Sequence, residues 1–227
     1  ASRTVPFVAK ARGIPIAKVA AKVMTGDLLK DLLKKIKIRD LKTFNVKESV
    51  FPFNKFDGVD LVLGPEMKST GEVMGIDKTF LSAFIKSQIS AGIFLPNKGN
   101  VFLSVDDNNK DKLLPLAKKL KKLNFNLIAT KGTGLFLRKY NIDTKFINKA
   151  KENSPNIVDS LIKGEIDLVI NTTKSTASIK DSYQIRRTSL VNNIPYFTTI
   201  AGAKVAIDAI KTLKKNNLNV RSLQSIH

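Results

Sequence analysis

The second half of the chain alternates short apolar runs with amphipathic stretches, and this alternation limits the possible folds more than any other feature. Short apolar runs bounded by turn residues indicate buried strands, and helical spacing marks the stretches between them. Strands that alternate with helices form a parallel sheet covered by helices on both faces. The expected strands are 101–105, 125–129, 145–147, 166–170, 195–200 and 220–225, and the expected helices are 110–123, 134–140, 157–163, 179–191 and 204–214.

The first ninety residues have a different pattern. Four stretches with helical spacing surround one β-rich run and one long glycine-punctuated stretch, which is too long for an ordinary loop. The sequence therefore predicts two parts, residues 1–90 and 101–227, joined by a linker at 91–100. The expected helices of the first part are 4–11, 16–24, 27–37 and 78–89, its β-rich run is 46–53, and its irregular stretch is 54–75.

One strand of the second part leads into an anion-binding motif. The run Phe125–Ala129 is followed by Thr-Lys-Gly-Thr-Gly at 130–134, and a helix is expected from Leu135. A glycine turn before a helix directs unpaired backbone N–H groups at whatever lies there, as in a phosphate cradle. A glycine after a strand is more often an ordinary turn. The motif alone leaves both interpretations open.

Two further polar stretches follow other predicted strands. Asn-Thr-Thr-Lys at 171–174 comes directly after the run 166–170, and Thr198–Thr199 lies at the end of the run 195–200. Ligands of open parallel sheets bind at the carboxyl ends of the strands. Three hydroxyl-rich strand ends on one edge favour a convergent polar site over three separate turns.

The composition excludes several kinds of chemistry. The chain has no cysteine and a single histidine, His227, so neither disulfides, thiolate metal sites nor a Ser-His or Cys-His pair are expected, and we predict no metal site. No apolar run is long enough to cross a membrane, and we expect no signal peptide. We expect a cytoplasmic globular protein, and the start at Ala1 without Met suggests a fragment.

The net charge of +20 indicates an anionic ligand or partner. Lys118, Lys119, Lys121 and Lys122 lie within one amphipathic helix and are typical of a solvated face instead. Arginines are few, tryptophan is absent, and aromatic and basic residues are not interleaved as in single-strand-binding proteins. Nucleic acid is therefore a disfavoured partner, kept as an alternative.

Several longer motifs of the chain match a known family. They are Ser2–Val8, Val50–Phe56, Gly64–Gly75, Asn171–Thr173 and Ile185–Arg187. On these motifs, essentially the whole chain resembles the C-terminal end of the large subunit of carbamoyl-phosphate synthase. The resemblance implies an α/β fold: an open, mainly parallel five-stranded sheet with helices on both faces, methylglyoxal-synthase-like, as an allosteric regulatory domain. An α+β fragment of the carbamoyl-phosphate-forming ATP-grasp unit would precede it.

The same resemblance implies an activity that needs more than this chain. The intact enzyme makes carbamoyl phosphate from bicarbonate, glutamine-derived ammonia and two ATP, for arginine and pyrimidine synthesis. It uses ATP with Mg or Mn, and its glutaminase small subunit and the rest of the large subunit would be partners. The family's glycine-rich loop and metal-binding residues lie before Ala1, so the fragment is expected to hold no cofactor and to be inactive. Arg3 matches a position beside the phosphate-transfer site, but it also reads as an ordinary residue at a helix N-terminus.

Two effector sites follow from the resemblance. Ornithine would bind between the two parts, at Glu48, Tyr196 and Thr198; Phe197 stands where relatives often have an acidic residue, so this binding depends on whether the contacts there run through the backbone. A nucleoside monophosphate, UMP or IMP, would bind at the strand ends, where lysines supply charge while hydroxyls and amides hold the phosphate. The matching residues are Lys110, Thr130, Thr133, Lys149, Asn171, Thr172, Thr173 and Ser182.

A free-standing lyase of the methylglyoxal-synthase type is a second alternative. It would need a catalytic carboxylate near the phosphate site, and the matching strand ends carry no Gly-Gly-Asp stretch. It would also leave the first 90 residues without a role.

Overall fold

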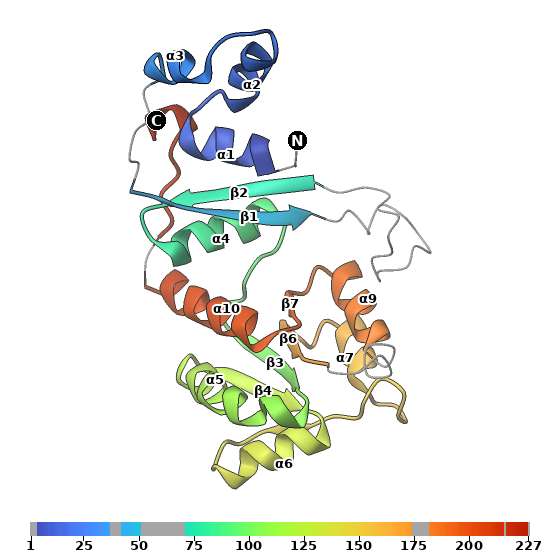
Figure 1. Ribbon diagram of the computed structural model, residues 1–227. Coiled ribbons are helices and arrows are strands. Elements are labelled where there is room, and N and C mark those ends of the chain that lie inside the picture. Colours follow the sequence, from blue (N-terminus) through green and yellow to red (C-terminus); the bar gives the residue numbers. More distant parts are fainter. Residues whose placement is uncertain (1–3, 37–41, 51–70, 174–181, 216, 227) are drawn as a thin grey trace.

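The computed structural model describes residues 4–36, 42–50, 71–173, 182–215 and 217–226. Figure 1 shows the N-terminal helices at one end of the molecule, a two-stranded sheet with one helix beneath it, and a larger sheet with its covering helices at the other end. In the described residues no helix is both long and apolar enough to cross a membrane.

The N-terminal part is built on the antiparallel strands β1 (Phe44–Val50) and β2 (Gly71–Asp77). Helix α4 (Phe80–Ser90) packs against both strands. Its N-cap is Thr79, whose side chain accepts a hydrogen bond from Ser82 N at 3.2 Å. The helices before the sheet are α1 (Thr4–Arg12), α2 (Ile16–Met24) and α3 (Leu29–Lys34).

Strand β2 corrects the prediction of irregular structure over 54–75. Residues 54–70 lie outside the described part, but 71–75 are strand, paired from Gly71 with Val50 to Gly75 with Val46. One of the glycines that suggested a loop, Gly75, has a packing role instead. A Cβ on Gly75 would overlap Ala83 O and lie 2.5 Å from Ser87 N, so the absence of a side chain there lets the backbone of α4 approach the strand.

The C-terminal part contains the predicted open parallel sheet. Its five strands are ordered β5-β4-β3-β6-β7, and every pairing between neighbours is parallel. The strands are β3 (Gly99–Ser104), β4 (Phe125–Ala129), β5 (Lys145–Phe146), β6 (Leu168–Asn171) and β7 (Tyr196–Phe197). The connecting helices are α5 (Lys110–Lys122), preceded by the 3-10 turn η2 (Asp107–Asn109), then α6 (Lys131–Lys139), α7 (Ile157–Ile162), α9 (Tyr183–Val191) and α10 (Ile200–Leu213).

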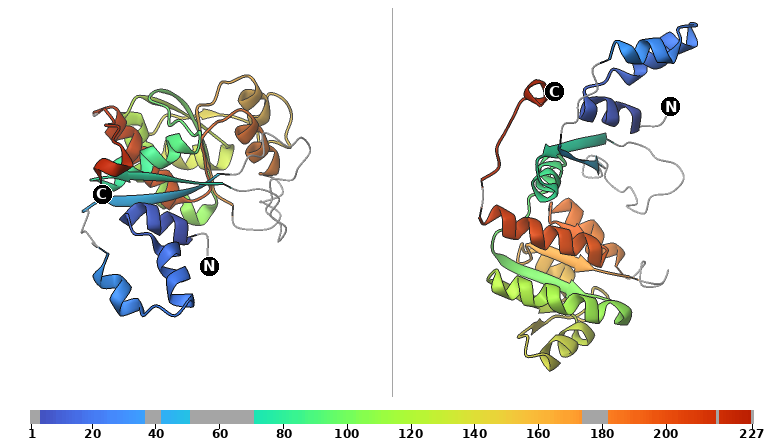
Figure 2. Two further views of the ribbon diagram at one scale, coloured as in Figure 1. Left: turned by 90° about the horizontal axis from the view of Figure 1, so that it is seen from above. Right: turned by 60° about the vertical axis from the view of Figure 1, so that its left-hand side comes forward.

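Both faces of this sheet are buried. In β3, Val101 and Leu103 join a core with α5, α6 and α10, whereas Phe102 joins a second core with α7 and α9. The two views of Figure 2 show these two sets of helices on opposite sides of the strands. Burial on both faces explains why the central strands read as unbroken apolar runs rather than as alternating ones.

The two parts meet through α4 and α10, which pack against each other. Between the parts, α4 ends at Ser90 and β3 begins at Gly99. The linker at 91–100 and the division into 1–90 and 101–227 stay predictions.

The predicted last strand at 220–225 is wrong. Residues Leu223–Ser225 form the 3-10 helix η3, and Val220 is 96% exposed. The chain after α10 leaves the five-stranded sheet and runs back toward the two-stranded one (Figure 1), where the charge of Arg221 acts on Asp77. Val220 pairs with no strand in the described residues, so local β propensity did not decide its structure.

Candidate functional site

The carboxyl ends of β3, β4 and β6 bring together two of the three predicted polar stretches, whereas Thr199 of the third is the N-cap of α10. Ser104, the last residue of the central strand β3, is paired in register with Asn171 of β6. On the other side of β3, Thr130 N donates to Leu103 O at 3.3 Å and Thr130 Oγ1 to Ser104 Oγ at 3.3 Å. Thr172 N donates to Ser104 O at 3.0 Å. The segments from 130 and from 171 therefore flank one strand end.

Helix α6 begins earlier than predicted and forms the base of the site. Thr130 is its N-cap, and Lys131 to Gly134, expected as a turn, are its first residues. The Thr130 side chain makes no capping bond, and Gly134 N bonds Thr130 O at 2.8 Å as the first helical hydrogen bond. The amides of residues 131–133 thus lack helical acceptors and carry the positive end of the helix dipole. This is the geometry that binds an anion.

The threonine hydroxyls at this edge already have protein partners. Thr133 Oγ1 accepts from Val105 N at 3.2 Å, and Thr172 Oγ1 donates to Asp106 Oδ2 at 2.9 Å. Thr130, Thr133 and Thr172 are all buried. Their hydroxyls therefore fix the strand ends to each other, and the backbone amides are left as the donors available to a ligand.

Asp106 is a member of this edge that the sequence did not suggest. Its carboxylate accepts hydrogen bonds from Thr172, from Asn109 Nδ2 at 2.6 Å and from Asn108 N at 3.2 Å. Burial would raise the pKa of Asp106, but these bonds outweigh burial and hold the pKa below its usual 3.8. The signal that could have found it is its place, directly after the apolar run 101–105.

The two predicted lysines of the site differ in their surroundings. Lys110 Nζ lies 2.6 Å from Asp107 Oδ1, and a Cβ on Gly132 would be 3.8 Å from the same nitrogen, so this ammonium group stands beside the first turn of α6. Lys149 is exposed. Ile147 N bonds Ala129 O at 3.1 Å, so the chain passes the end of β4 two residues before Lys149.

The remaining predicted residues lie farther along β6 and on α9. Asn171 is buried, and its Nδ2 donates to the hydroxyl of Tyr196 at 3.1 Å. Thr173 is half-buried and is the last described residue before the gap at 174–181. Ser182 is buried at the N-cap of α9, where its side chain makes no capping bond.

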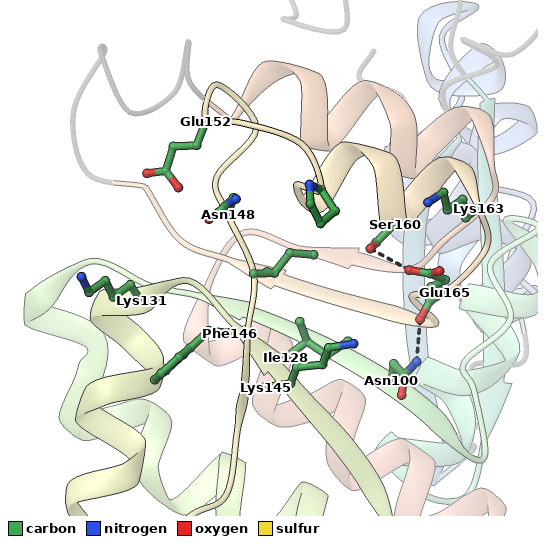
Figure 3. Close-up of a pocket in the computed structure, with 12 residues that line it drawn as sticks. Asn100, Ile128, Lys131, Lys145, Phe146, Asn148, Glu152, Ser160, Lys163 and Glu165 are labelled. Carbon is green, nitrogen blue, oxygen red and sulfur yellow. Dashed lines mark hydrogen bonds between the residues drawn. The ribbon is translucent and has the colours of Figure 1, made fainter.

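A cavity of about 610 Å³ adjoins the start of α6. Figure 3 shows Lys131, Asn148 and Glu152 at one end and Lys163, Glu165 and Asn100 at the other. The polar groups near the far end bond each other, since Ser160 Oγ donates to Glu165 Oε2 at 2.8 Å and Asn100 Nδ2 to Glu165 O at 2.7 Å. Apolar side chains form much of the wall between the two ends: Ile128, Phe146, Ile147 and Pro155.

The residues predicted for ornithine are split between the two parts. Glu48 lies on β1, and Gln88 Nε2 of α4 donates to its Oε2 at 2.9 Å. Tyr196 lies on β7, and Thr198 is exposed just before α10. Burial, with the positive charge of Arg186 and the bond from Asn171 partly offsetting it, raises the pKa of Tyr196. Arg3, the predicted catalytic residue, lies outside the described residues.

Glu48 should make stability depend on pH. Burial raises the pKa of Glu48 above its usual 4.5, and the Gln88 hydrogen bond offsets only part of this effect. The folded state therefore binds the proton of Glu48 more tightly than the unfolded state does. The stability gained from this proton is present below the usual pKa of 4.5 and is lost as pH rises through the raised pKa. Thermal unfolding of Glu48→Gln should give a higher Tm than the wild type at pH 7 and an equal Tm at pH 4. An equal Tm at both pH values would contradict the desolvation of this carboxylate.

The described residues contain no group of three or more His, Cys, Asp and Glu placed to hold a metal ion. The predicted dependence of the intact enzyme on ATP with Mg or Mn stays a prediction.

Comparison with known proteins first gives the class of the C-terminal part. Residues 112–198 match the MGS-like domain family. A solved structure of methylglyoxal synthase from Elizabethkingia anophelis NUHP1 is 22% identical, with a TM-score of 0.40, over 50% of this chain and 79% of its own.

Other relatives match nearly the whole of this chain. The carbamoyl phosphate synthase large chain of Myxococcus xanthus (strain DK1622) is 49% identical over 224 residues, which are 99% of this chain and 21% of that one. The C-terminal section of the carbamoyl phosphate synthase large chain of Aquifex aeolicus (strain VF5) is 47% identical over 247 residues, covering 100% of this chain and 46% of the relative. This chain is similar over nearly its whole length to carbamoyl phosphate synthase large chains, including a C-terminal section, and it spans less than half the length of these relatives.

Proposed function

We propose that this chain is the C-terminal, regulatory portion of a carbamoyl-phosphate synthase large subunit, an ATP-dependent ligase that serves arginine and pyrimidine synthesis in the cytoplasm. Residues 1–90 would complete the carbamoyl-phosphate-forming ATP-grasp unit, and residues 101–227 would carry allosteric control. The rest of the large subunit and the glutaminase small subunit are the proposed partners. The observation that supports this most is the identity of nearly half of all residues across the full chain.

The proposed effector is a nucleoside monophosphate, UMP or IMP. The unpaired amides at the start of α6 would hold the phosphate, with Lys110 and Lys149 supplying positive charge. The adjoining cavity, with its partly apolar wall and its amide side chains, offers space of the kind a nucleoside needs. Calorimetric titration of the chain with UMP and with IMP tests this, and no heat of binding with either would refute it.

Ornithine is the proposed second effector, held between the two parts with its amino group on Glu48. In the described residues the carboxylate is partly desolvated and accepts a hydrogen bond from Gln88 Nε2. A cation would relieve this cost, because an opposite charge favours the ionised form. Ornithine should raise the Tm of the wild type and leave that of Glu48→Gln unchanged. Equal shifts in the two proteins would place ornithine elsewhere.

The chain alone is proposed to be inactive. Purified protein incubated with ATP, Mg and bicarbonate should release ADP at the rate of a control without enzyme. ATP-dependent phosphorylation of bicarbonate by this chain would contradict the assignment of the missing catalytic groups to the preceding part of the subunit.

A free-standing lyase is the weaker candidate. Asp106 is a carboxylate at the strand ends, where such an enzyme would need a base. Its hydrogen bonds lower its pKa, which makes it a poor base near neutral pH. The relatives also match the first 90 residues, which a lyase would not use.

A further inference from the structure

We infer that Asp107 is a built-in competitor of the phosphate at this site, because it holds Lys110 in an ion pair that a bound anion must displace. The inference rests on the proposed function and adds a control on affinity to it. Asp107 is then a residue that sets how much effector the site needs, without itself binding the effector.

The position of Lys110 supports competition. Its Nζ is 2.6 Å from Asp107 Oδ1 and stands close to Gly132, in the first turn of α6. The amides of residues 131–133 lack helical acceptors, so an anion that accepts from them would lie near this ammonium group. One ammonium group cannot keep full contact with both the Asp107 carboxylate and a phosphate, so the two anions compete for it.

Asp107 is held in place although its side chain is 90% exposed. The preceding residue, Asp106, caps the 3-10 turn by accepting from Asn108 N, and Asn109 N bonds Asp106 O at 3.0 Å. Asp106 also accepts from Thr172, which ties the turn to the end of β6. The turn therefore fixes the backbone of Asp107, whose side chain contacts Lys110.

The two partners differ in burial, and this decides the expected effect. The side chain of Lys110 is only 21% exposed, whereas that of Asp107 faces water. An ion pair with an exposed partner is weak: its loss changes an equilibrium constant by only about a few-fold. Removal of the Asp107 charge should therefore tighten binding of a monophosphate by about threefold and leave the fold intact.

The test is a titration of UMP and of inorganic phosphate into the wild type, Asp107→Asn and Asp111→Asn. Asp111 is an exposed acid in the first turn of α5, so its variant removes the same charge nearby without breaking the ion pair. Asp107→Asn should bind about threefold more tightly than both other proteins. A gain in affinity would not follow from structural damage. Equal binding by all three, or an equal gain in both variants, would overturn the inference.

A double-mutant cycle provides the second arm. In a Lys110→Met background the Asp107→Asn change should no longer alter affinity, because the charge for which the carboxylate competes is gone. A gain that persists in that background would mean that Asp107 acts through the general field instead. If the wild type binds neither UMP, IMP nor phosphate, the proposed function fails and this inference with it. If the wild type binds and Asp107→Asn changes nothing, only the inference fails.

Discussion

Lys149→Ala is expected to weaken binding of UMP or IMP by roughly tenfold or more. A charge-assisted hydrogen bond to a phosphate contributes on the order of 1.5–3 kcal/mol, and about 1.4 kcal/mol is a factor of ten in affinity. Lys149 lies two residues after Ile147, whose N–H bonds Ala129 O at the end of β4, directly before Thr130. The side chain of Lys149 is exposed. Calorimetric titration of the variant against the wild type measures the loss.

Lys122→Ala is the matched control for this experiment. Lys122 is exposed and is the last residue of α5, whose first residue, Lys110, lies at the effector edge. Removal of the same charge at the far end of the helix should change affinity less than twofold at moderate salt, because solvent and ions screen distant charges. Equal losses for the two lysines would mean diffuse attraction by the net charge of +20, and the nucleic-acid alternative would gain support.

The second large effect is on stability and concerns Gly75→Ala. The new Cβ would overlap Ala83 O and lie 2.5 Å from Ser87 N, so α4 would have to move away from β2. Overpacking against a helix backbone costs about 2–3 kcal/mol, which lowers the Tm by about 5–10 °C for a chain of this size. Thermal unfolding followed by circular dichroism gives the shift.

Gly71→Ala serves as the control for Gly75→Ala. It lies on the same strand, and its nearest neighbour for a new Cβ is Val50 Cβ at an ordinary 3.6 Å. Alanine costs less backbone entropy than glycine in a strand, so this variant should keep or slightly raise the Tm. A large loss in Gly71→Ala would mean that the strand rejects any side chain, and the argument from the α4 contact would fail.

The sheet was predictable because its signal is local. Each central strand is a short run buried on both faces, as Phe102 and Leu103 show by joining opposite cores, and such runs are visible without knowledge of the fold. The polar residues after two of these runs, at 130 and at 171, meet at one edge because parallel strands end together. A parallel topology was therefore enough to bring Thr130 and Thr172 close to each other.

Two of the missed features depend on contacts distant in sequence. Nothing in the sequence around Gly75 indicates that a helix backbone packs against it, so the glycines there predicted irregular structure instead of a strand. Asp106 gains its role from Thr172, 66 residues away. The ion pair of Lys110 with Asp107 depends on the 3-10 turn that begins after Asp106, and the apolar periodicity of the chain carries no sign of that turn.

The amide NMR spectrum of the isotope-labelled chain during titration with UMP and IMP tests the central claim most directly, because it locates a bound ligand residue by residue. The account predicts saturable shifts with at least one of the two nucleotides. They should centre on the amides of residues 131–133 at the start of α6 and on 171–173 at the end of β6, with the last turn of α5 unchanged. Shifts that spread over the exposed lysines without saturation, or no shifts at 131–133 with either nucleotide, would contradict a built phosphate site in this protein.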